Sequence, residues 1–171
     1  MRKVEVTPYS VKWKSDFEKE AQKLQIIYGS ELYAIHHIGS TSVQGLSAKP
    51  IIDIMPVVKD VSLVDAYDEE MAGIGYEALG EFGISGRRYF RKGGNERTHH
   101  IHLFEEGSPH IERHLAFRDF LREHPDYATA YGELKEGLAK EFPNDMEAYI
   151  AGKADFIKEV EKIALEWYRK L

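Results

Sequence analysis

Residues 36–54 read HHIGSTSVQGLSAKPIIDI, with two strand-like runs on either side of a polar turn. The first run ends at Gly39-Ser40, and the second is apolar on both faces except at Asp53, as expected of a buried central strand. A glycine lets a ligand approach the backbone closely, and the N–H groups at the start of a helical turn bind phosphate. The stretch therefore predicts a phosphate-binding turn next to a buried acid.

Five residues of this stretch are candidates for holding a phosphate: Gly39, Ser40, Thr41, Ser42 and Lys49. The hydroxyl side chains and the backbone of the turn offer donors, and the Lys49 ammonium can neutralise phosphate or pair with Asp53. An isolated carboxylate among isoleucines is costly to bury, and a metal ion, a cation or a ligand hydrogen bond relieves that cost. The alternative interpretation is a capped helix followed by one structural aspartate.

Upstream of the turn, apolar residues recur every three or four positions from Trp13 to Ile27, which predicts a helix that ends at Gly29. A strand follows at Leu32 to Ile38, and a second strand is expected at Ile51 to Val58. After it, the pattern favours a helix from about Ser62 to Met71.

The middle of the chain alternates short strands with turns. Three strands are expected, at Tyr76 to Leu79, Arg88 to Lys92 and Thr98 to Phe104, with a hairpin turn at Gly93-Gly94-Asn95. From Pro109 onward the pattern is helical, and Pro125 and Pro143 each suit the first turn of a helix.

These elements predict an α+β fold in one domain over residues 1–171. Its mixed β-sheet core occupies about residues 30–106 and is covered by helices, and a helical part occupies about residues 108–171. We find no internal repeat and no linker-like stretch that would divide the chain.

Composition narrows the class of partner. The net charge of −6 argues against duplex nucleic acid as the main partner, although a local basic pocket can still hold a phosphate-bearing small molecule. The absence of cysteine excludes disulfides and thiolate metal sites. No apolar run approaches the roughly 20 residues of a membrane span, and the N-terminus lacks the apolar segment of a signal peptide. We therefore expect a cytoplasmic protein.

The run His99-His100-Ile101-His102 is the second group of candidate site residues. In a strand His100 and His102 share a face, so with Asp53 they would form a metal site if the two strands pair. Two nitrogens and one oxygen favour Zn²⁺, Mn²⁺ or Fe²⁺ over Mg²⁺. Asp53 and His102 are the candidate catalytic residues, and buried histidines satisfied by neighbours are the alternative. A histidine-triad hydrolase would need a third histidine where Phe104 stands.

Arginines gather around the expected strand that begins at Arg88. Arg88 is a further candidate for phosphate binding, and Arg87 and Arg91 share the other face of that strand. A guanidinium pairs well with phosphate oxygens. A solvated edge strand explains the same residues equally well.

Three segments together resemble the GrpB family: His37 to Ile54, Arg97 to Leu103, and Ile111 to Pro125. The resemblance extends from Val11 to about Ile157 and implies a nucleotidyltransferase-like fold. In polymerase-β-type nucleotidyltransferases, which the Gly-Ser turn and later acid also resemble, the turn holds triphosphate and acids on the next strand hold Mg²⁺. A GrpB-like domain is joined to dephospho-coenzyme A kinase in some bacteria, which implies a link to nucleotide or coenzyme A metabolism.

One departure from the nucleotidyltransferase pattern bears on activity. The positions two away from Asp53 are Ile51 and Met55, where those enzymes place a second acid. A lone carboxylate holds two Mg²⁺ ions poorly, because Mg²⁺ prefers octahedral oxygen ligands. Three functions therefore remain open: an enzyme that transfers or hydrolyses a nucleotidyl or phosphoryl group, a catalytically silent nucleotide-binding module, and an interaction protein without a ligand.

Overall fold

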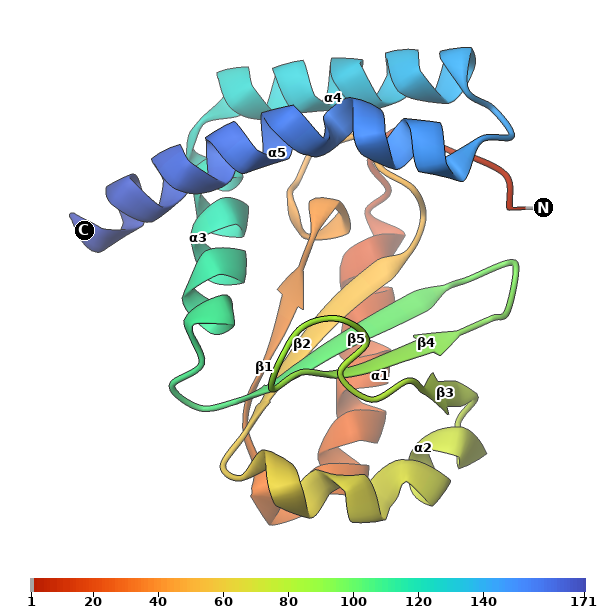
Figure 1. The fold of residues 1–171 in the computed structure, drawn as a ribbon, viewed down its shortest axis with the longest axis vertical. Coiled ribbons are helices and arrows are strands. Elements are labelled where there is room, and N and C mark those ends of the chain that lie inside the picture. The colour runs from red at the N-terminus through yellow and green to blue at the C-terminus, as the bar shows by residue number, and fades with distance from the viewer. Residues whose placement is uncertain (1) are drawn as a thin grey trace.

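The computed structural model describes residues 2–171 and contains one five-stranded sheet with helices around it (Figure 1). The strands are β1 (Leu32–Ile38), β2 (Ile52–Val58), β3 (Tyr76–Ala78), β4 (Arg88–Lys92) and β5 (His99–Glu105). The α-helices are α1 (Lys12–Tyr28), α2 (Asp68–Gly73), α3 (Pro109–Glu123), α4 (Pro125–Glu141) and α5 (Met146–Arg169). Short 3₁₀ helices are η1 (Gly29–Glu31), η2 (Ser40–Ser42) and η3 (Val61–Tyr67).

The sheet is mixed, with the strand order β1-β2-β5-β4-β3. Strand β2 pairs with β1 in the antiparallel sense and with β5 in the parallel sense, and the remaining pairs are antiparallel. The predicted α+β mixed sheet is confirmed. Its register places Asp53 opposite Ile38 on one side and opposite His100 on the other.

The two faces of the sheet have different neighbours. One face carries Ile54, Phe90 and Ile101, which pack against Leu24 of α1 and Met71 of α2. These side chains are almost fully buried, and each such burial stabilises the fold by roughly 1.5–3 kcal/mol. The opposite face is covered in part by α3, and the pair α4 and α5 packs on α3 and on the loop after η2 (Figure 1).

Helix α3 packs its Ile111 and Leu115 on Met55 and Phe104 of the sheet. Because side chains alternate along a strand, Asp53 lies on the same face as Met55. The helices α4 and α5 lie across the end of the sheet near η2 (Figure 1). The loop after η2 packs beneath α4, where Leu46 approaches within 3.5 Å of the position a Cβ would take at Gly132.

Two predicted elements differ from the structure. The helix expected at Ser62 to Met71 is instead the 3₁₀ helix η3 followed by the short helix α2. The helix expected to open at Pro143 begins at Met146, because the Asp145 side chain accepts a hydrogen bond from the Ala148 N–H at 3.1 Å and so caps the helix there. Among the helices of residues 2–171, none is long and apolar enough to cross a membrane.

Candidate anion-binding site

Gly39 fixes the distance between the turn and the acid. Its φ is +72°, a conformation that favours glycine, and a Cβ at this position would lie 2.5 Å from Asp53 Oδ2. Asp53 therefore lies next to the Gly39-Ser40 turn, as the sequence predicts. Ser40 and Asp53 line the same cavity.

Two histidines of β5 approach one oxygen of Asp53. His102 Nε2 lies 3.0 Å from Asp53 Oδ1, and His100 Nδ1 lies 3.6 Å from the same atom. On the other side of the ring, Arg87 Nη1 faces His102 Nδ1 at 3.5 Å. Since a guanidinium only donates, Nδ1 accepts, and Nε2 carries the proton that His102 donates to Asp53. Both nitrogens of His102 are thus occupied, and the residue orients the carboxylate.

The Asp53 carboxylate is held in its ionised form. Burial by itself would raise its pKa, but the interactions that the carboxylate accepts from His100 and His102 outweigh burial, so the pKa of Asp53 lies well below its usual value. The side chain is 26% exposed. That exposed part borders the cavity, where a cation or a ligand donor would meet a negative charge.

The cavity beside Asp53 has a volume of about 130 Å³. Its walls come from both halves of the chain. The turn and the strands supply Ser40, Thr41, Lys49, Asp53 and His100, and the helices supply Lys135 of α4 with Tyr149 and Lys153 of α5. The cavity is therefore complete only because α4 and α5 lie across this end of the sheet.

Three lysines converge on this cavity. The Lys135 side chain is buried, with the residue only 1% exposed, and burial followed by the charges of Lys153 and Lys49 lowers its pKa to about 6. Burial and the charge of Lys49 lower the pKa of Lys153 to about 8, and burial lowers the pKa of Lys49 as well. Asp53 opposes each of these shifts without cancelling it. The cavity thus has more cationic groups than its one carboxylate can neutralise.

Hydrogen-bonding groups without partners concentrate here. Four buried side-chain polar atoms in residues 2–171 lack a partner, and three of them belong to residues that line this cavity: His100 Nε2, Lys135 Nζ and Tyr149 Oη. An unsatisfied buried polar group costs about 1–3 kcal/mol. An anion with several acceptor oxygens would satisfy Lys135 Nζ and Tyr149 Oη together, and His100 Nε2 is left to accept a proton from a ligand.

The structure brings most of the predicted site residues together, with three exceptions. Ser42 turns away from the cavity, because its Oγ donates to the Gly39 carbonyl oxygen and its own carbonyl accepts from Arg122. Arg88 lies on the opposite face of the sheet and pairs with Asp65 at 2.8 Å. His102 supports Asp53 from outside the cavity, and His100 is the histidine that lines it.

The residues present do not fit the two-metal site that the fold implies. Ile51 and Met55, two positions before and after Asp53, are apolar and buried, so neither can be a second acidic ligand. The imidazoles of His100 and His102 both approach the same oxygen, Asp53 Oδ1. Within residues 2–171 no group of three or more histidine, aspartate or glutamate side chains is arranged to hold a metal ion. Metal binding by Asp53, His100 and His102 stays a prediction.

Sequence analysis missed the three residues that the helices contribute. No site residue was predicted after Arg88 except the histidines of β5, whereas Lys135, Tyr149 and Lys153 line the cavity with Asp53. A signal was present: Lys135 stands between Tyr131 and Leu138 at helical spacing, so a lysine occupies an apolar stripe. Such a position calls for a buried partner of opposite charge.

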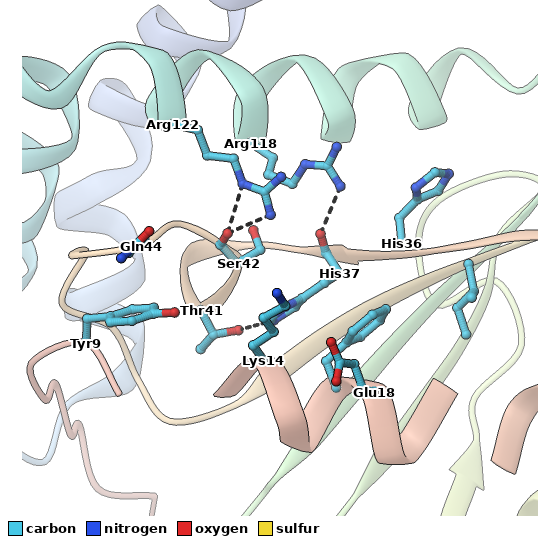
Figure 2. Close-up of a pocket in the computed structure, with 12 residues that line it drawn as sticks. Tyr9, Lys14, Glu18, His36, His37, Thr41, Ser42, Gln44, Arg118 and Arg122 are labelled. Atoms are coloured by element: carbon cyan, nitrogen blue, oxygen red, sulfur yellow. Dashed lines mark hydrogen bonds between the residues drawn. The ribbon is translucent and has the colours of Figure 1, made fainter. Parts of the chain in front are cut away.

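A larger pocket of about 630 Å³ lies on the other side of the turn (Figure 2). Figure 2 shows Arg118 and Arg122 reaching from α3 to the backbone of the turn region, where Arg118 donates to the His37 carbonyl oxygen and Arg122 to that of Ser42. Inside, His37 Nε2 lies 2.9 Å from Thr41 Oγ1. These contacts hold η2 in place, and Thr41 lines both this pocket and the cavity beside Asp53.

Comparisons with known proteins place the chain among relatives. A family model described as GrpB protein matches residues 3–162. The UPF0157 protein YqkA of Bacillus subtilis (strain 168) is 50% identical over 166 residues, which is 97% of this chain and 48% of that protein. The chain thus spans about half the length of this relative. A more distant match, at 22% identity, covers 96% of this chain and 46% of a dephospho-CoA kinase of Mycolicibacterium paratuberculosis.

Two solved structures bear on the fold. The conserved protein GrpB from Enterococcus faecalis superposes with a TM-score of 0.93 at 48% identity, over 96% of this chain and 99% of that chain. A Cid1 poly(U) polymerase bound to MgATP superposes with a TM-score of 0.54 at 12% identity, over 78% of this chain and 44% of that chain. The second likeness shows the nucleotidyltransferase-like fold alone.

Proposed function

Because this chain belongs to the GrpB family and has a nucleotidyltransferase-like fold, we propose that it binds a nucleotide or another phosphate-bearing small molecule. The phosphate occupies the cavity beside Asp53. The observation that carries the proposal is the set of unpartnered buried groups, His100 Nε2, Lys135 Nζ and Tyr149 Oη, around one small space.

The chemistry of these groups suits a phosphate. Lys135 and Tyr149 donate to its oxygens, and the ammonium groups of Lys49 and Lys153 add attraction. At about 130 Å³ the cavity is smaller than the roughly 300–1,000 Å³ of pockets that enclose a whole small ligand. It therefore takes a phosphate end and leaves the rest of the ligand outside.

Positive charge in this proposal comes from ammonium groups and not from a divalent ion. Asp53 is the one carboxylate on the cavity, and Lys49, Lys135 and Lys153 surround it. A phosphate that meets three lysines requires no metal to balance its charge. Binding should accordingly persist in EDTA, and tighter binding with Mg²⁺, Mn²⁺ or Zn²⁺ would instead favour the metal site predicted from Asp53, His100 and His102.

Calorimetric titration tests the proposal with inorganic phosphate, tripolyphosphate, ATP, UTP and dephospho-coenzyme A, each with EDTA or with a divalent metal. The variant is Lys135→Met, and the matched control is Lys140→Met, an exposed lysine on the same helix. We expect Lys135→Met to weaken binding at least tenfold and the control to bind like the wild type.

Loss of fold would not explain that result, because Lys135→Met removes a buried group without a partner and should raise the melting temperature. The proposal is wrong if the wild type binds none of these compounds at millimolar concentration. It is equally wrong if Lys135→Met binds them as tightly as the wild type.

Group transfer is a second candidate function, favoured by His100. Its Nε2 is unpartnered on the cavity while its Nδ1 is 3.6 Å from Asp53 Oδ1. In this arrangement Nε2 accepts the proton of an attacking hydroxyl as that oxygen bonds to phosphorus, and the bond to the leaving phosphate breaks.

The test of group transfer is product formation from ATP or UTP with candidate acceptors. His100→Gln should lose turnover while calorimetry finds its nucleotide binding within a few-fold of the wild type.

A further inference from the structure

The cavity beside Asp53 adjoins a second one of about 400 Å³. Lys49 and Ile51 line both spaces, so a ligand anchored in the first can extend past Lys49 into the second. The second cavity lies between the N-terminal segment, the loop that joins β4 to β5, and the first residue of α5, Met146.

This second cavity gathers more cationic residues than carboxylates. Its cationic residues are Arg2, Lys3, Lys49 and Arg97, and its carboxylates are Glu5 and Glu96. Among the salt bridges of residues 2–171, none involves any of these four cations. Arg97 Nε donates to the Gly94 carbonyl oxygen at 3.3 Å, which leaves its charge unneutralised.

The cations influence one another across the space. Burial first and then the charge of Arg97 lower the pKa of Arg2. Arg2 and Arg97 in turn contribute to the lowered pKa of Lys49. Like charges held together destabilise each other unless an anion lies among them. Pro50, Ile51 and Met146 add an apolar wall, which suits the uncharged body of a ligand.

We propose that the ligand carries two separate anionic groups, one on each side of Lys49. The first phosphate occupies the cavity beside Asp53, and the second group lies among Arg2, Lys49 and Arg97. The proposal rests on the proposed function and adds a substrate class to it: a nucleotide with a second phosphate apart from the first, such as a nucleoside 3′,5′-bisphosphate, is preferred over a nucleoside monophosphate.

The pocket of Figure 2 is a weaker place for the second group. Its arginines already donate to backbone carbonyl oxygens, and Arg118 also pairs with Asp119 at 2.8 Å. Thr41 and the turn separate that pocket from the first phosphate. The space beyond Lys49 is the better place, because its cations Arg2, Lys49 and Arg97 form no salt bridge within residues 2–171.

Calorimetry with adenosine 5′-monophosphate and adenosine 3′,5′-bisphosphate tests the proposal at one fixed ionic strength, with EDTA present. The wild type should bind the bisphosphate at least tenfold more tightly. Arg97→Gln should bring the bisphosphate close to the monophosphate and leave the monophosphate unchanged. Glu96→Gln, which removes a carboxylate from the same loop, should strengthen only the bisphosphate.

The outcomes separate this proposal from the one it rests on. Lys135→Met should weaken both ligands, because it acts on the phosphate that they share. If the wild type binds both compounds equally, or if Arg97→Gln weakens both to the same degree, the two-anion proposal is wrong while phosphate binding stands. If neither compound binds, both proposals fail.

Discussion

Gly39 gives a direct test of how the turn and the acid depend on each other. Gly39→Ala would put a methyl group 2.5 Å from Asp53 Oδ2 and impose strain at φ +72°. We expect a loss of about 1–3 kcal/mol in unfolding free energy, measured with guanidinium chloride, together with weaker phosphate binding. Gly45→Ala is the control, since Gly45 has φ +85° but nothing within 4 Å of an added Cβ. Equal losses in the two variants would assign the effect to backbone strain alone.

The lowered pKa values of Lys135 and Lys153 predict how anion binding depends on pH. Without a ligand, burial holds the pKa of Lys135 at about 6 and that of Lys153 at about 8. A bound anion favours the charged forms and raises both pKa values, so binding takes up protons. Affinity should therefore be greatest below pH 6 and fall as the pH rises through 6 and then through 8.

Sulfate is the probe for this dependence, because its charge stays constant over the range. Calorimetry in two buffers with different ionisation enthalpies measures the proton uptake directly. Lys135→Ala should remove the part of the dependence near pH 6 and leave the part near pH 8. A wild-type affinity that does not change between pH 5.5 and 9 would contradict the assignment of these two lysines to the site.

At the level of secondary-structure elements, the contact between α4 and α5 positions the residues that these two helices contribute to the cavity. Replacing a helical glycine by alanine normally stabilises a helix by about 0.5–1 kcal/mol. Gly137→Ala on α4 should show this gain, because nothing lies within 4 Å of the added Cβ. Gly152→Ala on α5 should instead destabilise the fold by about 1–2 kcal/mol, since its Cβ would collide with the Leu138 side chain of α4.

Thermal unfolding of the two variants measures the difference. Because Lys135 and Lys153 reach the cavity from these two helices, Gly152→Ala should also weaken phosphate binding, and Gly137→Ala should not. Equal stabilisation by both substitutions would show that Leu138 moves aside freely.

The strands were more predictable than the helices. Short runs between turn residues identified β1, β2, β4 and β5 within one residue at each end, and β2 was recognised because it is apolar on both faces except at Asp53. The region 62–71 was predicted as one helix, yet its short apolar pattern also fits a 3₁₀ helix, and local sequence does not separate the two. Asp53 and Gly39 could be predicted together because both belong to one continuous stretch.

For the whole molecule, the cavity joins the sheet to the helical part. A ligand at one hundred times its Kd should stabilise the fold by about 2.7 kcal/mol. Hydrogen exchange should then slow most in β2, β5, α4 and α5, which border the cavity, and least in α2 and β3, which lie at the far side of the sheet (Figure 1). Uniform slowing across the chain would instead indicate that binding acts on global unfolding alone.

Long-range packing explains why the site was only half predicted. Residues 40–102 contribute the part that local patterns revealed, whereas Lys135, Tyr149 and Lys153 depend on how α4 and α5 cross the end of the sheet. No periodicity in a single chain specifies that crossing. The net charge of −6 was likewise a poor guide, because the cations are concentrated at one place.

The buried Lys135 also has a consequence for the chemical reactivity of the protein. An ordinary lysine amine is protonated at pH 7.5, but with a pKa of about 6 this one is mostly an uncharged nucleophile. Cyanate is a small anion that the neighbouring ammonium groups attract, and it carbamylates free amines. Lys135 should therefore be modified ahead of the surface lysines. Folded protein exposed to low concentrations of cyanate would lose its anion site before its surface lysines are modified.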